Sequence, residues 1–138
     1  MTDHHFYKQI TNDLEELPLI AEAIELFAEQ ADWSAAIVMQ LNLVIEELIV
    51  NTINYGYTNG RTGQIQIFIN SNSQEIILNI TDDGDAYNPL ENALPDTTLE
   101  IEDRPIGGLG IFLVKNYMDT FKYEYIEGKN CLSLSKQL

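Results

Sequence analysis

The stretch Leu41–Tyr57 reads LNLVIEELIVNTINYGY, and its pattern decides how the rest of the chain is arranged. Apolar and small side chains recur in it at spacings of three and four, which is typical of the buried face of a helix. These positions are Leu41, Val44, Ile45, Leu48 and Thr52. Ser34 offers an N-cap for this helix, and Gly56 is expected to close it in the left-handed conformation. The sequence therefore predicts one long helix packed against a core.

Two polar side chains interrupt the apolar pattern of this helix. Glu47 and Asn51 are four residues apart, so they lie on one face and one turn from each other. A glutamate can accept a proton, and an asparagine offers a neutral carbonyl oxygen to a hard cation. Taken alone, the pair also fits a simpler interpretation, in which Glu47 is exposed and Asn51 bonds locally. The chemical meaning of the pair depends on motifs elsewhere in the chain.

Outward from this helix, the hydrophobic pattern predicts further strands and helices. The expected elements are a strand at 5–10, a helix at 14–30 with Pro18 in its first turn, strands at 63–70 and 75–80, a long loop at 85–105, a helix at 111–121 and a closing hairpin made of FKYEYI and NCLSLS. Two strands joined by a short turn form an antiparallel hairpin. The order predicts a single α+β domain over residues 1–138, a two-layer sandwich with helices on one face of a mixed, mostly antiparallel sheet.

The charge of the chain is strongly negative, because 7 Lys+Arg stand against 22 Asp+Glu and give a net charge of −15. A field of this sign repels phosphate backbones and anionic lipids, so neither direct nucleic-acid binding nor membrane association is expected. It favours a basic protein partner, or it serves solubility alone. The single Cys131 permits no internal disulfide, and no leader or uninterrupted apolar run of about 18 residues is present, so a cytoplasmic protein is expected.

Two glycine-containing motifs follow the long helix. Asp82-x-Gly84 ends a predicted strand, where the acid can accept a hydrogen bond from an exocyclic amine and the glycine lets the backbone approach a flat ring. A plain Asp-Gly turn is the alternative. Gly107-Gly108-Leu109-Gly110 precedes a helix, and the N–H groups at such a start favour an anion. A hinge for the preceding loop is compatible with that role.

The three signals in this order resemble the Bergerat-fold (GHKL) ATP-binding superfamily of gyrase, heat-shock chaperone, histidine kinase and mismatch-repair ATPases. Glu47 to Asn51 resembles its N-box, residues 82–86 its first glycine box, and Gly107–Gly110 its second. The wording DDGDAYNPL and RPIGGLGIFLVKNYMD is most similar to the anti-sigma factor/serine kinase branch. The resemblance covers nearly the whole chain.

The resemblance implies ATP and Mg²⁺ as ligands and a role for each matching residue. Glu47 would be the catalytic base that accepts a proton from the attacking hydroxyl, and Asn51 would ligate Mg²⁺. Asp82 would bind the adenine amino group, and Gly84 would make room for the purine. The other implied cofactor-binding residues are Ala86, in place of the second glycine of the first box; Gly107, Gly108, Leu109 and Gly110 around the phosphates; and Arg104, the one basic residue of an acidic lid from about Asn88 to Ile106.

The function implied by the resemblance is that of an ATP-binding anti-sigma regulatory factor. Such a protein phosphorylates an anti-sigma-factor antagonist on Ser or Thr and, in its other partnership, sequesters a sigma factor. The alternative is a nucleotide-gated protein-binding module with little or no kinase activity. Glu47 favours the kinase, since binding alone needs no base, whereas the acidic lid favours the binding module. A homodimer is compatible with either interpretation.

Overall fold

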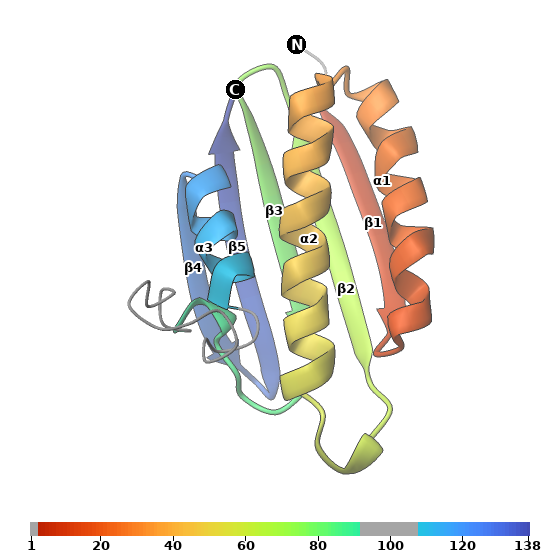
Figure 1. Ribbon diagram of the computed structural model, residues 1–138, viewed down its shortest axis with the longest axis vertical. Coiled ribbons are helices and arrows are strands. Elements are labelled where there is room, and N and C mark those ends of the chain that lie inside the picture. Colours follow the sequence, from red (N-terminus) through yellow and green to blue (C-terminus); the bar gives the residue numbers. More distant parts are fainter. Residues whose placement is uncertain (1–2, 92–107) are drawn as a thin grey trace.

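The computed structural model describes residues 3–91 and 108–138, which form one sheet with helices packed against it (Figure 1). The elements in chain order are β1 (His4–Thr11), η1 (Leu14–Glu16), α1 (Leu17–Gln30), α2 (Ala35–Tyr55), η2 (Thr58–Gly60), β2 (Gln64–Ser71), β3 (Glu75–Asp82), η3 (Pro89–Glu91), α3 (Gly108–Tyr117), β4 (Thr120–Ile126) and β5 (Lys129–Gln137), where η denotes a short 3₁₀ helix.

The sheet has five strands in the order β1-β2-β3-β5-β4, and Figure 1 shows α1, α2 and α3 together on one of its faces. This arrangement confirms the predicted α+β two-layer sandwich. Each of the four pairings between the described strands is antiparallel, so the parallel pair that a mixed sheet would contain is not found among them. None of the described helices covers the other face of the sheet, where Tyr7 and Phe68 are exposed, as is common for antiparallel sheets.

The core lies between the sheet and the apolar faces of the helices. Along β3, alternate residues point inward, and Ile76, Leu78 and Ile80 are buried. The predicted apolar face of α2 is buried too, with Leu41, Val44, Ile45, Leu48 and Thr52 among its buried residues. Fully burying one such aliphatic side chain contributes about 1.5–3 kcal/mol. This packing fixes the rotation of α2, and therefore which way Glu47 and Asn51 face.

The ends of α2 agree with the sequence at the N-terminus and differ at the C-terminus. The Ser34 side chain accepts a hydrogen bond from the backbone N–H of Ile37, so the predicted cap is confirmed. Gly56, however, has φ −92° and ψ −13°, a right-handed conformation and not the expected left-handed one. Its N–H still donates to Thr52 in the helical pattern, while its carbonyl accepts from the N–H of Asp85 at 2.6 Å. The tertiary contact therefore determines how the helix closes.

Helix α3 is shorter than the sequence predicted, because it ends at Tyr117 and not at residue 121. The next strand already begins at Thr120, and the N–H of Asp119 donates to Ser135 on β5 at 2.8 Å. Phe121 and Tyr123 are aromatic residues that suit a strand as well as a helix. Pairing with β5 decides between the two.

The turn between β4 and β5 contains two successive residues with positive φ, Glu127 at 51° and Gly128 at 79°. Such a turn matches the twist of a two-residue hairpin. It sets the register of β5, in which Asn130 lies directly opposite Asp82 on β3.

By length and composition alone, α2 is apolar enough to cross a membrane. A helix in the core of a soluble domain passes the same test, and seven residues of α2 are buried inside this fold. The expectation from the sequence concerned only uninterrupted apolar runs, and Glu46 and Glu47 interrupt the apolar pattern of α2.

Candidate functional site

Glu47 and Asn51 contact each other on the face of α2 that lies toward α3. The Asn51 amide nitrogen donates to the Glu47 backbone carbonyl and to Glu47 Oε1, both at 2.8 Å. Asn51 is 3% exposed, so its side chain is held in this position by the packing around it. The Asn51 carbonyl oxygen Oδ1 and the second Glu47 oxygen Oε2 accept no hydrogen bond from the described residues. One carbonyl oxygen and one carboxylate oxygen are therefore left for a ligand.

Gly110, in the first turn of α3, packs directly on this carboxylate. A Cβ added to Gly110 would lie 1.9 Å from Glu47 Cδ and 2.1 and 2.3 Å from its two oxygens. Only a residue without a side chain can bring the start of α3 this close to α2. The structure thus brings together three of the residues that the sequence singled out.

At the end of β3, the Asp82 side chain is buried and well bonded. Its Oδ1 accepts from the backbone N–H of Gly84 at 2.9 Å and from the Asn130 amide at 2.8 Å. Its Oδ2 accepts no hydrogen bond from the described residues. Gly84 lies against the end of α2, since a Cβ at this position would meet the Gly56 carbonyl oxygen at 2.6 Å. The need for glycine here therefore comes first from helix packing, whatever else this loop binds.

The two groups of residues lie toward the same end of the molecule. Asn51 and Gly56 are five residues apart on α2, which corresponds to about 7.5 Å along the helix axis. In Figure 1, β3 ends beside this end of α2, and α3 begins beside the half of α2 that leads to it. The Glu47–Asn51 pair on α2 and Asp82 at the end of β3 therefore lie toward the same end of the molecule.

The pKa values of the two adjacent acids move in opposite directions. Burial raises the pKa of Asp82, although its hydrogen bonds from Asn130 and Gly84 act the other way. Burial also acts to raise the pKa of Asp83, but the hydrogen bonds from the Gln64 N–H and the Tyr57 hydroxyl outweigh it, and the pKa is lowered. The hydrogen bonds of Asp83 thus favour its ionised form, whereas burial makes ionisation of Asp82 costly.

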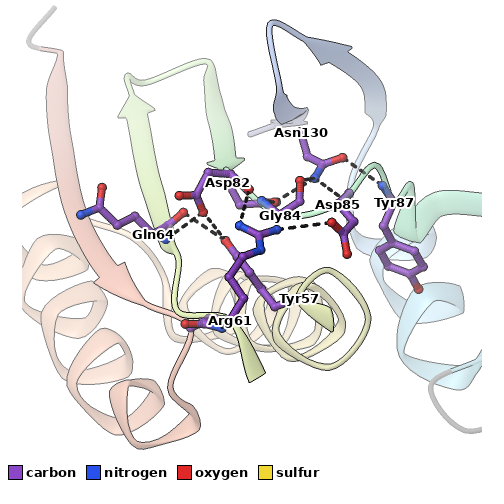
Figure 2. Close-up of polar contacts among 10 residues, drawn as sticks. Tyr57, Arg61, Gln64, Asp82, Gly84, Asp85, Tyr87 and Asn130 are labelled. Atoms are coloured by element: carbon purple, nitrogen blue, oxygen red, sulfur yellow. Dashed lines mark hydrogen bonds and ion pairs between the residues drawn. The ribbon is translucent and has the colours of Figure 1, made fainter. Parts of the chain in front are cut away.

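A second set of polar contacts, which the sequence did not indicate, joins the α2–β2 loop to the loop after β3 (Figure 2). The Tyr57 hydroxyl donates to Asp83 Oδ1 at 2.8 Å. Arg61 donates to the Asp83 carbonyl at 3.2 Å and pairs with Asp85 at 3.3 Å, while its guanidinium lies 5.2 Å from the centre of the Tyr57 ring. These contacts hold the loop around Asp82 from the side opposite Asn130.

Asn130 is the other residue that sequence reasoning missed. It is 4% exposed and lies at the start of β5, where Figure 2 shows it between Asp82, Gly84 and Tyr87. Apart from the Tyr123 hydroxyl on the neighbouring strand, its partners are 43 to 48 positions away in the chain, so no local pattern could have indicated its role. The one available signal is that Asn130 is a polar residue on the inward face of β5, where the next inward residues are Leu132 and Leu134.

Other residues proposed from the sequence are less informative in the structure. Ala86 is exposed on the loop after β3. Gly108 and Leu109 begin α3, so their backbone N–H groups lie in its first turn. Arg104 and Gly107 lie outside the described residues, as does the proposed lid apart from 88–91.

Chemically, the site offers a carboxylate oxygen, an amide oxygen, a second buried carboxylate and the start of a helix. An amide oxygen suits a hard cation such as Mg²⁺, and a helix start suits an anion such as phosphate. Among the described residues no group of three or more His, Cys, Asp or Glu side chains converges as a metal site. A cation here would therefore take its remaining ligands from water or from its anionic partner.

Comparison with known proteins gives consistent matches over most of the chain. The family described as histidine kinase-like ATPase domain matches residues 10–136. A serine/threonine-protein kinase BtrW of Bordetella bronchiseptica is 29% identical over 112 residues, covering 81% of this chain and 79% of that protein. An anti-sigma F factor of Clostridium beijerinckii is 21% identical, covering 93% and 90%. A serine-protein kinase RsbW of Listeria monocytogenes is 26% identical, covering 73% and 67%.

Proposed function

This chain belongs to the family of histidine kinase-like ATPase domains, and from that premise we propose that it binds ATP and Mg²⁺ where α2 ends and α3 begins. The observation that carries the proposal is the contact of Glu47 with both Asn51 and Gly110. Through this contact the proposed base, Glu47, lies directly against both the proposed cation ligand, Asn51, and the anion-binding start of α3 at Gly110. We further propose that residues 1–138 act as a single cytoplasmic domain, alone or as a homodimer.

In this proposal the nucleotide base lies against the end of β3. The free Oδ2 of Asp82 accepts a hydrogen bond from the exocyclic amine of adenine. Gly84, which has no side chain, leaves the purine room beside the loop. Ala86 is a small residue on the same loop and is proposed as a further contact.

The phosphates lie toward α3. The backbone N–H groups of Gly108, Leu109 and Gly110 hold their oxygens, and the N-terminal end of the helix dipole favours their charge. Asn51 contributes its free Oδ1 as a cation ligand. Mg²⁺, when bound, would neutralise phosphate charge and fix the phosphate geometry. Gly107 and Arg104 are proposed as additional phosphate contacts.

The reaction that this arrangement supports best is transfer of the γ-phosphoryl group to a Ser or Thr hydroxyl of a protein. The hydroxyl oxygen bonds to the γ-phosphorus, the bond from phosphorus to the ADP oxygen breaks, and Glu47 Oε2 accepts the hydroxyl proton. The Asn51 hydrogen bond to Oε1 keeps the carboxylate oriented for this step. Phosphoryl transfer depends mainly on positioning and charge neutralisation, so few side chains are needed.

The proposed substrate is an anti-sigma-factor antagonist, and the proposed second partner is a sigma factor that the protein sequesters. Two kinds of relative support this: serine-protein kinases and anti-sigma F factors. A surface of net charge −15 favours basic partners and disfavours direct contact with nucleic acid.

A second candidate is a nucleotide-gated binding module that transfers phosphate slowly or not at all. The observation in its favour is the charge of the proposed lid, where residues 88–106 contain five acids and only one basic residue, Arg104. Little positive side-chain charge is then available to stabilise the transferred phosphoryl group.

The two candidates are separated by measuring binding and transfer on the same proteins. ATP binding with and without Mg²⁺ is measured by calorimetry, and transfer from γ-labelled ATP is measured to a purified anti-sigma-factor antagonist from the same genome. Glu47→Gln is expected to retain ATP binding and lose transfer. Glu46→Gln, an exposed neighbour, is the matched control and is expected to change neither. Binding without transfer in the unmodified protein supports the binding module, and absence of ATP binding contradicts both.

A further inference from the structure

Asn130 uses every hydrogen-bonding group of its side chain within the site. Its Nδ2 donates to Asp82 Oδ1 at 2.8 Å and to the Asp85 carbonyl at 2.9 Å, with a longer contact of 3.4 Å to the Gly84 carbonyl. Its Oδ1 accepts from the Tyr87 backbone N–H at 3.0 Å and from the Tyr123 hydroxyl. The side chain therefore ties β3, β4, β5 and the loop after β3 to one point (Figure 2).

The orientation of this amide is determined by its surroundings. Exchanging Oδ1 and Nδ2 would set an N–H₂ group against the N–H of Tyr87 and an oxygen against the Asp82 carboxylate. Both contacts would then be repulsive, so only the observed orientation satisfies all partners. An ionised aspartate or an alanine at this position cannot supply donors on one side and an acceptor on the other, and a serine has only one donor on a single short hydroxyl.

The consequence for Asp82 is a carboxylate with one bonded and one free oxygen. Two donors, the Gly84 N–H and the Asn130 amide, both bind Oδ1. Hydrogen bonds of this kind favour the ionised form and fix the plane of the carboxylate. Oδ2 is thereby left as a pure acceptor in a constant direction.

We propose that Asn130 is a positioning residue that makes the site select adenine over guanine nucleotides by holding Asp82 as an ionised acceptor. The proposal rests on the proposed function, since it assigns selectivity to the same site. Adenine carries a donor amine where guanine carries the acceptor O6. An ionised Oδ2 accepts from the first and repels the second, whereas a protonated carboxyl group could donate to guanine O6.

The first test is the ratio of ATP affinity to GTP affinity, measured by calorimetry. Asn130→Ala is expected to lower this ratio roughly 10- to 100-fold, because a hydrogen bond to a charged group is lost. Asn79→Ala, on the outward face of the sheet and without contact to Asp82, is the matched control and is expected to leave the ratio unchanged. An unchanged ratio in Asn130→Ala overturns the proposal.

The second test is the pH profile of ATP binding in Asn130→Asp. A carboxylate in place of Nδ2 would face Asp82 Oδ1 at about the same distance, so the two acids must share a proton to stay in place. ATP affinity is therefore expected to fall as pH rises from 6 to 8, relative to the unmodified protein. Asp83, Asp85, Arg61, Tyr57 and Tyr123 also face this region, but they are common to both proteins and cancel in the comparison. Parallel pH profiles count against the proposal.

A milder variant covers the case in which changes at Asn130 unfold the protein. Tyr123→Phe removes one of the two donors to Asn130 Oδ1, and Tyr123 is a half-buried residue on the largely exposed edge strand β4. It is expected to lower the ratio of ATP affinity to GTP affinity by a smaller factor than Asn130→Ala does, and an unchanged ratio in the folded variant overturns the proposal.

If the unmodified protein binds ATP and GTP equally, the selectivity proposal fails while the nucleotide site stands. If it binds neither, the proposed function fails first.

Discussion

Replacing Gly110 with alanine would put a methyl group where the Glu47 carboxylate now lies. The added Cβ would be 1.9 Å from Glu47 Cδ, whereas carbon atoms in contact are about 3.5–4.0 Å apart. The carboxylate must then retreat by about 1.6 Å or more. Since Asn51 bonds to Glu47 Oε1 at 2.8 Å, a shift of this size breaks that hydrogen bond.

The effect on folding stability is expected to be small, because two terms oppose each other. Losing the hydrogen bond costs about 1 kcal/mol, while alanine in place of glycine within a helix contributes about 0.5–1 kcal/mol. The net change is within about 1 kcal/mol, which corresponds to a shift in Tm of roughly 3–5 °C for a domain of this size. The effect on phosphoryl transfer is expected to be much larger, since a misplacement of about 1 Å can lower a rate roughly 100-fold.

A double-mutant cycle isolates the contact from the catalytic proposal. In a Glu47→Ala background the clash is absent, so Gly110→Ala is expected to stabilise the protein in thermal unfolding. In the unmodified background the same change is expected to be neutral or destabilising. Equal changes in Tm in both backgrounds would refute the contact between Gly110 and Glu47. A Gly110→Ala protein that transfers phosphate at the normal rate would refute the catalytic geometry.

Two further changes test the other parts of the site. Asp82→Asn keeps an acceptor for Gly84 and Asn130 but removes a buried acid. Because burial raises the folded-state pKa of Asp82, the unmodified protein is most stable with respect to this group below the unfolded pKa of about 3.9, where the acid is neutral in both states. That stability is lost as pH rises through the folded-state pKa and the buried carboxyl group must ionise. The variant is therefore expected to gain about 0.5–2 kcal/mol at pH 8, and less at pH 5, in thermal unfolding without nucleotide, while losing affinity for ATP; a gain that does not depend on pH would contradict the assignment of burial as the cause. Asn51→Ala is expected to abolish the extra thermal stabilisation by ATP that Mg²⁺ provides, with ATP alone stabilising as before, and an undiminished Mg²⁺ effect would exclude Asn51 as a ligand.

The sequence predicted the parts of the molecule that depend on local geometry. The apolar face of α2 and the Ser34 cap follow from helical spacing and from side chains near in sequence. The same spacing places Glu47 beside Asn51, since one helical turn separates them. The right-handed conformation of Gly56 at the end of α2 could not be predicted, because its carbonyl accepts a hydrogen bond from the N–H of Asp85 on a loop distant in sequence.

The surroundings of Asp82 show the same limit more clearly. An Asp-x-Gly motif indicates a turn and a candidate ligand, but not the partners that hold the acid. The Asn130 amide that holds Asp82 comes from β5, and Tyr57 and Arg61 of the α2–β2 loop hold the next residue, Asp83. Only the folded sheet brings these groups together. Likewise, α3 stops early because β4 pairs with β5, a choice that residue preferences alone leave open.

The short turn between β4 and β5 has a consequence for the chemistry of the site. A one-residue slip of paired strands sends each side chain to the opposite face of the sheet. Here such a slip would replace Asn130 with Lys129 or Cys131 beside Asp82, giving a salt bridge or a thiol where a neutral amide now lies. The backbone angles of Glu127 and Gly128, two residues at the tip of this hairpin, therefore determine which side chain lies beside the buried aspartate.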